Sequence, residues 1–121
     1  MAQSRRSIVG LLAVVLLVSL ASQWWGRHLE QSLARDLARL AGPGDILMIA
    51  SDTCPYCDAA RHFMKEAGVS FTECSIERDA QCLQKFQGSL MQGTPVVVVR
   101  GQMQQGFNAQ RVLDRLAQRA G

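Results

Sequence analysis

A run of twenty residues without a charge, Ser7 to Gly26, restricts the N-terminal part of this chain more than any other feature. As a helix the run spans about 30 Å, roughly the thickness of the hydrocarbon core of a bilayer. Arg5 and Arg6 precede the run and a pair of tryptophans closes it, as basic and aromatic residues do at membrane faces. The sequence therefore predicts that residues 1–26 form a transmembrane anchor with the N-terminus in the cytoplasm.

A cleaved export signal is the alternative interpretation. The apolar centre, Ile8–Val18, has the length of a signal-peptide core, and the small residues from Ser19 to Ala21 resemble a cleavage site. The preceding SRRSIV is also weakly similar to a twin-arginine export signal. Both interpretations carry the rest of the chain across a membrane, which in a bacterium leads to the disulfide-permissive periplasm. We expect a domain anchored on the extracytoplasmic side, or else a protein secreted after cleavage.

The remaining charges are nearly balanced. The chain has a formal net charge of +3, but from Arg27 onward eleven basic residues stand against ten acidic ones. A nucleic-acid-binding domain needs a basic patch or stripe, and this composition offers none. We therefore expect no nucleic-acid partner.

Residues 27–44 are predicted to be a juxtamembrane helix and linker. Leucines recur there at helical spacing, but they cover barely two heptads, too few for a coiled coil. These leucines are Leu29, Leu33, Leu37 and Leu40. The sequence GPG that follows ends the helix and marks a boundary, so the domain is predicted to comprise residues 45–121.

Within residues 45–121, apolar periodicity predicts alternating strands and helices. In order they are a strand at 45–50, a helix at 56–67, a strand at 69–74, a helix that ends near Gly88, strands at 95–100 and 103–105, and a last helix from Ala109 to Ala120 with Asn108 as its N-cap. The helix between the first two strands makes them parallel, and the tight turn between the last two makes a hairpin. The expected fold class is α/β, a four-stranded mixed sheet with helices on both faces.

The segment Cys54-Pro55-Tyr56-Cys57 stands where the first predicted strand passes into the first helix. Unpaired N–H groups and the macrodipole at this helix end stabilise an anion, so the pKa of the Cys54 thiol should be low. A thiolate attacks disulfides, and Cys57, one turn further on, can resolve the mixed disulfide that results. Pro55 fits the first turn because its missing N–H costs little there. The spacing predicts a redox pair in which Cys54 is exposed and Cys57 is covered.

The four cysteines also allow other arrangements. A zinc ribbon would repeat the short gap of the first pair, whereas seven residues separate Cys74 from Cys82, and the two lie on different predicted elements. Cys54 and Cys57 could instead form a permanent structural disulfide. Haem attachment would need a histidine where Asp58 stands. We predict no metal site. Cys74 and Cys82 are expected to form a structural disulfide, with two buried thiols and an auxiliary redox pair as alternatives.

Residues 45–121 resemble a glutaredoxin, a family of the thioredoxin-fold superfamily. The matching motifs are TCPYC after a strand, GTPVVVV at the third strand and Gly106-Phe107 before the last helix. The resemblance implies that Pro95 follows a cis peptide bond and faces the cysteines, where an ordinary proline at the start of a strand is the alternative. It further implies a partner or glutathione groove. The residues expected to orient the partner or flank the groove are Tyr56, Thr94, Pro95, Gly106, Phe107 and Asn108.

Two positions depart from the family pattern. Glutaredoxins usually carry a lysine three residues before the first cysteine, where it pairs with a glutathione carboxylate, and here that residue is Ser51. The usual double glycine before the last helix is reduced to Gln105-Gly106. Both departures weaken the case for glutathione as reductant. The tail GFNAQRVLDRLAQ is also similar to that of periplasmic disulfide isomerases.

The expected function is that of a glutaredoxin-like thiol–disulfide oxidoreductase acting on protein or glutathione disulfides outside the cytoplasm. No bound cofactor is expected, with glutathione as an optional co-substrate. A non-catalytic thioredoxin-fold module that assembles a membrane partner, and a copper(I) metallochaperone using the cysteines as soft ligands, are the alternatives. His62 is a weaker candidate for assisting the cysteines. The methionines are expected to pack in the core or groove rather than bind copper.

Overall fold

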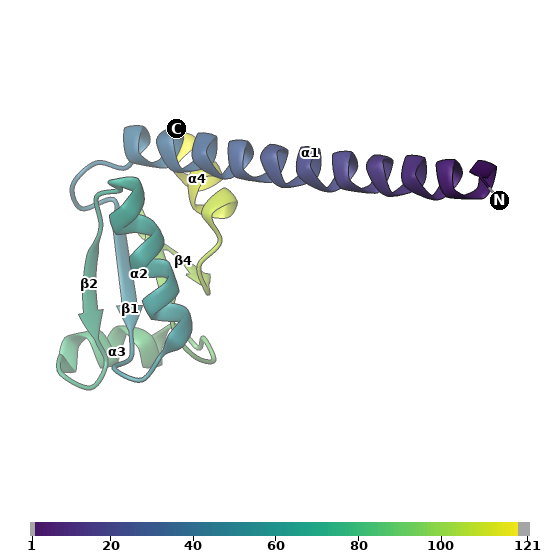
Figure 1. Ribbon diagram of the computed structural model, residues 1–121. Coiled ribbons are helices and arrows are strands. Elements are labelled where there is room, and N and C mark those ends of the chain that lie inside the picture. The colour runs from purple at the N-terminus through teal and green to yellow at the C-terminus, as the bar shows by residue number, and fades with distance from the viewer. Residues whose placement is uncertain (1, 119–121) are drawn as a thin grey trace. The chain divides into compact units, whose positions relative to one another are not determined.

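The N-terminal residues form one long helix. The computed structural model describes residues 2–118, and its first element, α1 (Ala2–Leu40), runs through the uncharged segment without a break (Figure 1). An 18-residue window of α1 has a mean hydropathy of 2.0, and none of it is buried. By length and composition α1 could cross a membrane, and an export signal near an N-terminus meets the same criteria. The long apolar helix expected from the sequence is therefore present.

The chain divides into two compact units, Met1–Ser32 and Leu33–Gly121. The C-terminal end of α1 thus belongs to the second unit. Leu37 is 1% exposed and lies in its core together with Leu33 and Ala41. The sequence interpretation places this stretch outside the domain as a juxtamembrane helix. The structure instead packs Leu33 and Leu37 of that helix in the core, while Leu29 and Leu40 stay exposed.

In the described part of the second unit, the strands form one four-stranded sheet. After α1 the elements are β1 (Ile46–Ala50), α2 (Pro55–Ala67), β2 (Thr72–Ser75), α3 (Ala80–Gly88), β3 (Val96–Val99), β4 (Gln102–Gln105) and α4 (Ala109–Ala117). The strand order is β2-β1-β3-β4, in which β1 is parallel to β2 and antiparallel to β3, and β3 is antiparallel to β4. The predicted mixed sheet, with its parallel first pair and its final hairpin, is confirmed. Ala120, predicted to extend the last helix, lies outside the described residues.

The second strand begins later than its sequence pattern predicts. Gly68 takes a left-handed conformation with φ 72° and caps α2, as the sequence indicates. The N–H of Val69 then donates to the Met64 carbonyl oxygen at 2.9 Å, so Val69 still belongs to the helix cap and is buried there. The strand β2 therefore begins at Thr72 and not at Val69.

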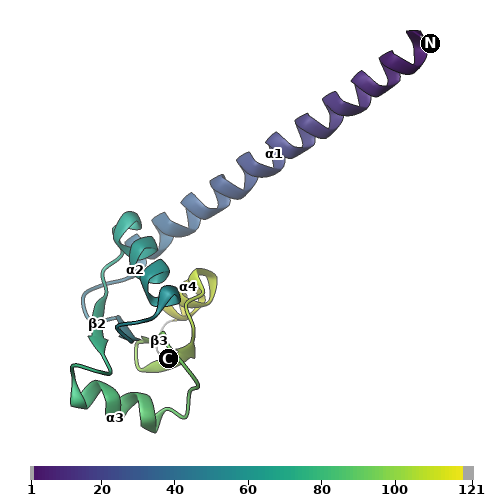
Figure 2. The ribbon, with the colours of Figure 1, turned by 60° about the horizontal axis from the view of Figure 1, so that its bottom comes forward.

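Helices cover both faces of the sheet. Successive residues of a strand point to opposite faces, so Met48 of β1 packs with α2 and α4, while its neighbour Ile49 packs with α3. Figure 2 shows α3 on one side of the strands and both α2 and α4 on the other. The helix that begins at the cysteine motif is thus held on the same face of the sheet as the C-terminal helix.

Candidate active site

Cys54 is the N-cap residue of α2, and Pro55 is its first helical residue. The Cys54 Sγ accepts a hydrogen bond from the Cys57 N–H at 3.1 Å. The two cysteines are joined by a disulfide, with their Cα atoms 5.2 Å apart. In the reduced protein the same N–H and the end of the helix dipole would favour the Cys54 thiolate, which is the condition for a nucleophilic cysteine.

Cys54 is less exposed than the sequence predicts. Cys54 is 7% exposed and Cys57 is fully buried, so Cys54 is the more exposed of the two, as expected. The expectation that Cys54 is open to solvent is wrong for the disulfide form. Its Sγ is bonded to Cys57 and lies 3.5 Å from the Thr94 carbonyl oxygen. This neighbour is forty positions away in the chain and comes from the loop before β3, so a local sequence pattern could not reveal it.

The peptide bond between Thr94 and Pro95 is cis, as the family resemblance implies. The antiparallel register pairs Ile49 with Val96, which brings the loop after β1 and the loop before β3 to the same end of the sheet. Pro95 is fully buried there, and its carbonyl oxygen accepts from the Gly106 N–H at 2.8 Å. The sheet thus places the cis proline beside the cysteine motif.

A groove of about 480 Å³ opens beside these residues. Its lining residues are Tyr56, Ala59, Ala60, Phe63, Thr94, Pro95, Gln105, Gly106 and Phe107. All predicted flanking residues except Asn108 are among them. Asn108 instead caps α4, where its side chain accepts from the Arg111 N–H at 3.0 Å. The groove is mainly apolar, which suits a partner that brings apolar surface next to its disulfide.

The sequence interpretation missed four lining residues: Ala59, Ala60, Phe63 and Gln105. The first three lie on the same face of α2 as Tyr56, at spacings of three, four and seven residues, and this periodicity is the signal that could have found them. The ring of Phe63 lies 5.6 Å from that of Phe107 and joins the two walls of the groove. Gln105 carries no such signal, because the sequence does not show where an isolated glutamine at a strand end points.

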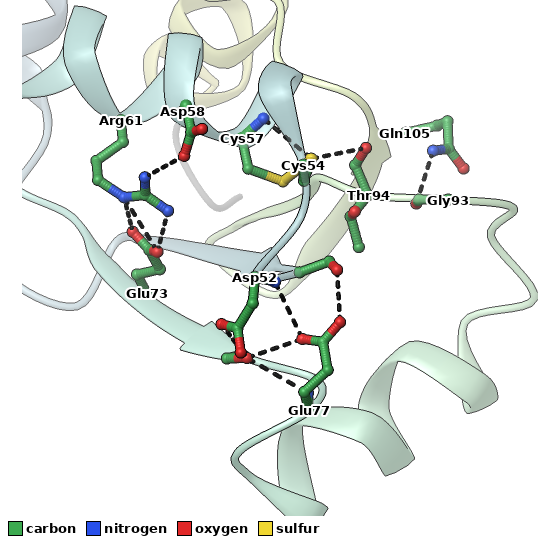
Figure 3. The surroundings of a disulfide bond; sticks show 12 residues. Asp52, Cys54, Cys57, Asp58, Arg61, Glu73, Glu77, Gly93, Thr94 and Gln105 are labelled. Atoms are coloured by element: carbon green, nitrogen blue, oxygen red, sulfur yellow. Dashed lines mark hydrogen bonds and ion pairs between the residues drawn. A yellow bond between two sulfur atoms is a disulfide. The ribbon is translucent and has the colours of Figure 1, made fainter.

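An acidic side chain anchors the loop that leads to Cys54. Ser51 Oγ donates to Glu77 Oε1 at 2.5 Å, and the Asp52 N–H donates to Oε2 at 3.1 Å (Figure 3). These bonds, above all that from the Ser51 hydroxyl, hold the pKa of Glu77 below its ordinary value. The position where glutaredoxins usually have a lysine therefore lies next to an ionised carboxylate at neutral pH.

Cys74 and Cys82 form a second disulfide, with their Cα atoms 6.0 Å apart. Cys74 lies near the C-terminal end of β2, and Cys82 is buried in the first turn of α3. Both pack in the core on the α3 side of the sheet, whereas Cys54 and Cys57 pack on the α2 side. The second disulfide therefore belongs to the opposite face of the sheet and stands apart from the groove.

Replacing both Cys74 and Cys82 with serine is expected to lower the free energy of unfolding by roughly 2–3 kcal/mol, because so short a loop is no longer closed in the unfolded chain. Urea unfolding of the full chain in detergent, with the Cys54–Cys57 pair intact, measures this loss. Alkylation and peptide mapping of the wild-type protein should recover the two cysteines as one linked peptide. Two fully alkylated residues in protein taken directly from cells would contradict the assignment.

The remaining candidates lie elsewhere. His62 is exposed on α2, and it is absent from the residues that line the groove. Met48 and Met64 are fully buried, while Met91 and Met103 pack against the α3-side core. Among residues 2–118, no cluster of three or more histidine, cysteine or acidic side chains could hold a metal ion.

Comparison with known proteins shows which proteins this domain resembles. Residues 46–104 match the family model described as Glutaredoxin. A mutant of the thioredoxin-like protein BC3987 has 26% sequence identity and a TM-score of 0.55, over 60% of this chain and 95% of its own. The unmutated BC3987 structure gives 24% and 0.52, over 58% and 97%. A mutated buckwheat glutaredoxin, at 11% identity and a TM-score of 0.50 over 74% and 92%, shares the fold.

A search of curated protein sequences found no match. The family match covers β1 to β3, the cysteine motif and the cis proline, whereas Gln105, Gly106 and Phe107 of the groove lie just beyond it. Residues 46–104 of this chain therefore match the glutaredoxin family model, and the domain that contains them has a thioredoxin-like fold.

Proposed function

We propose that this protein is a thiol–disulfide oxidoreductase in which Cys54 is the nucleophile and Cys57 the resolving thiol. The observation that carries the proposal is the position of the Cys54 sulfur. It lies at the N-terminus of α2, accepts the Cys57 N–H at 3.1 Å and adjoins the Thr94–Pro95 wall of the groove. The glutaredoxin family match supports this chemistry.

The reaction needs only the two cysteines and the partner disulfide. In the reducing direction the Cys54 thiolate attacks one partner sulfur, forming a mixed disulfide and releasing the other partner sulfur as a thiolate. The Cys57 thiolate then attacks the Cys54 sulfur, which releases the reduced partner and forms the Cys54–Cys57 disulfide. Two electrons pass from the protein to the partner, and the same steps in reverse oxidise a dithiol.

Protein disulfides are the proposed main substrates, with glutathione as a secondary co-substrate. The groove is walled by aromatic side chains, Tyr56, Phe63 and Phe107, which can pack against a polypeptide chain. Beside the cysteine loop, the Ser51–Glu77 contact places a carboxylate where a lysine would attract the carboxylates of glutathione. Like charges disfavour each other at such a site, so this arrangement favours polypeptide partners.

Replacing Ser51 with lysine is expected to raise activity on a glutathionylated peptide, but only partly, because the new ammonium would pair with Glu77. The double variant Ser51→Lys, Glu77→Gln should raise kcat/KM several-fold further, since its lysine is free. Steady-state kinetics on a glutathionylated peptide and on a disulfide-bonded protein, measured in parallel, give the ratio of kcat/KM for the two substrates. A wild-type protein that already prefers glutathione would refute the proposed substrate order.

The protein is also proposed to be anchored in a membrane through α1, with its domain on the extracytoplasmic side. The apolar stretch of α1 and the preceding Arg5 and Arg6 support this orientation. An export signal that is removed after translocation leads to the same compartment. Disulfides form and persist in that compartment, because the reductants of the cytoplasm do not reach it.

The anchor predicts that the mature protein pellets with membranes and resists carbonate extraction. A double variant with Val14→Arg and Leu17→Arg should lose membrane insertion, since each central arginine costs about 2.5–3.5 kcal/mol on insertion scales. Fractionation and N-terminal sequencing of both proteins decide the matter. A soluble wild-type protein that begins near Ser22 would establish the cleaved signal instead.

The function itself is tested with the reduced full-length protein in detergent. It should reduce a disulfide-bonded protein and accumulate the Cys54–Cys57 disulfide in equal amount. A protein that binds such partners without turnover would be an assembly module. Titration with copper(I) under reducing conditions identifies the metallochaperone, because only that function requires tight binding by the two thiolates.

A further inference from the structure

The side chain of Gln105 bonds to the backbone just before the cis proline. Its Nε2 donates to the Gly93 carbonyl oxygen at 3.0 Å, and its Oε1 accepts from the Gln92 N–H at 3.0 Å. A backbone N–H can only donate and a carbonyl oxygen can only accept, so these partners also fix the orientation of the amide. Figure 3 shows the bond to Gly93 next to the contact between Thr94 and Cys54.

The segment that receives these bonds has little structure of its own. Residues 89–95 connect α3 to β3 without forming helix or strand. Gly93 has φ 104°, a conformation that glycine adopts without steric cost, so the backbone in front of Thr94 is intrinsically permissive. The two side-chain bonds anchor it on one side. On the other side the Gly106 N–H donates to the Pro95 carbonyl oxygen at 2.8 Å.

The position of this segment matters because the Cys54 sulfur lies between two backbone dipoles. The Cys57 N–H, at 3.1 Å, stabilises a thiolate there. The Thr94 carbonyl oxygen, at 3.5 Å, opposes the thiolate because its own charge is partly negative. The balance between the two dipoles depends on how firmly the Thr94 carbonyl is held. The same residue also forms one wall of the groove.

We propose that Gln105 is a positioning residue for disulfide exchange. Its amide fixes the backbone of Gln92 and Gly93 and thereby holds the Thr94 carbonyl against the Cys54 sulfur and in the wall of the groove. The inference rests on the proposed oxidoreductase function. Gln105 forms no bond to sulfur and acts through Thr94.

Gln105→Ala is expected to produce two effects of opposite sign. With Thr94 free to move, the Cys54 thiolate loses an unfavourable neighbour, so alkylation of reduced Cys54 by a small reagent should become a few-fold faster at acidic pH. Exchange with a polypeptide disulfide should become about tenfold slower in kcat/KM, mainly through a higher KM, because the groove wall is no longer fixed. A merely structural residue would not raise thiol reactivity while lowering substrate affinity.

The experiment compares four full-length proteins in the same detergent: wild type, Gln105→Ala, Gln105→Glu and the control Gln102→Ala. Gln102 lies on the same strand, but its side chain bonds to Arg115 and not to the loop. Gln105→Glu keeps the acceptor for the Gln92 N–H and loses the donor to Gly93. The negative charge of the new carboxylate therefore faces the Gly93 carbonyl oxygen. The readouts are the pH profile of Cys54 alkylation, KM and kcat on a disulfide-bonded peptide, and hydrogen exchange of the Gln92 amide.

Both variants at position 105 should raise KM, and Gln105→Ala should also shift the alkylation profile to lower pH and release the Gln92 amide to exchange. Gln102→Ala should match wild type in all three readouts. Wild-type values for Gln105→Ala in KM and in the alkylation profile would overturn the proposal. An inactive wild-type protein would instead refute the oxidoreductase function, and the alkylation and exchange readouts would still decide the role of Gln105.

Discussion

The Cys54→Ser variant is expected to lose disulfide exchange completely, because it retains no thiol at the open end of α2. Serine is a favourable N-cap residue, so the helix itself should persist and the loss can be assigned to the missing nucleophile. The Cys57→Ser variant should instead accumulate a mixed disulfide with its partner, since capture at Cys54 continues while release does not. Mass spectrometry of both variants, purified from their native compartment, shows which adducts form.

The paired control for this prediction is the double variant Cys74→Ser, Cys82→Ser. It removes two cysteines from the opposite face of the sheet and should keep exchange activity while losing stability. In the reduced wild-type protein, Cys54 should alkylate at lower pH than Cys57, which is fully buried. Equal alkylation rates for the two thiols at every pH, with no trapped adduct, would remove the catalytic proposal and leave the assembly module.

Leu37→Ala is expected to destabilise the domain by roughly 2–5 kcal/mol, the usual cost of truncating a buried leucine. Leu37 is 1% exposed and packs in the same core as Met48 and Met64, which belong to β1 and α2. Small domains have only about 5–15 kcal/mol of total stability, so this single change should move the unfolding midpoint strongly. Urea unfolding of the full chain in detergent, followed by a signal from the domain, measures the effect.

Leu40→Ala is the matched control, because Leu40 lies on the same helix but is 37% exposed. Alanine and leucine are both good helix formers, so a difference between the two variants reports burial and not helix propensity. The Leu37 variant should lose clearly more stability than the Leu40 variant. Equal, small losses would mean that the end of α1 is not part of the domain core.

Much of the fold could be predicted from the sequence because its determinants are local. The β-branched run before Arg100 reads as a buried strand, and Gly68 ends a helix in the left-handed conformation. Asn108 caps α4 with its own side chain, as its residue type suggests. The exception is β2, where the cap that follows Gly68 uses Val69 and delays the strand by three residues, from 69 to 72.

The candidate site was predictable only in part. The positions of Cys54 and Pro55 could be predicted, because an N-cap thiol and a proline in the first helical turn depend only on adjacent residues. Phe63 shares a helix face with Tyr56, so its spacing could have indicated it, whereas Gln105 carries no such signal. The low exposure of Cys54 could not be predicted from the sequence either, since the Thr94 carbonyl group beside it is forty positions away in the chain.

By itself the sequence determined the long apolar helix, the order of strands and helices and the redox spacing of Cys54 and Cys57. These follow from composition, periodicity and capping, which act over a few residues. The tertiary structure alone decided that Thr94 meets Cys54, that Gln105 bonds to the loop before the cis proline, and that Leu37 enters the core. Such contacts depend on the pairing of β1 with β3 and of β3 with β4, because strand register sets which distant loops share one end of the sheet.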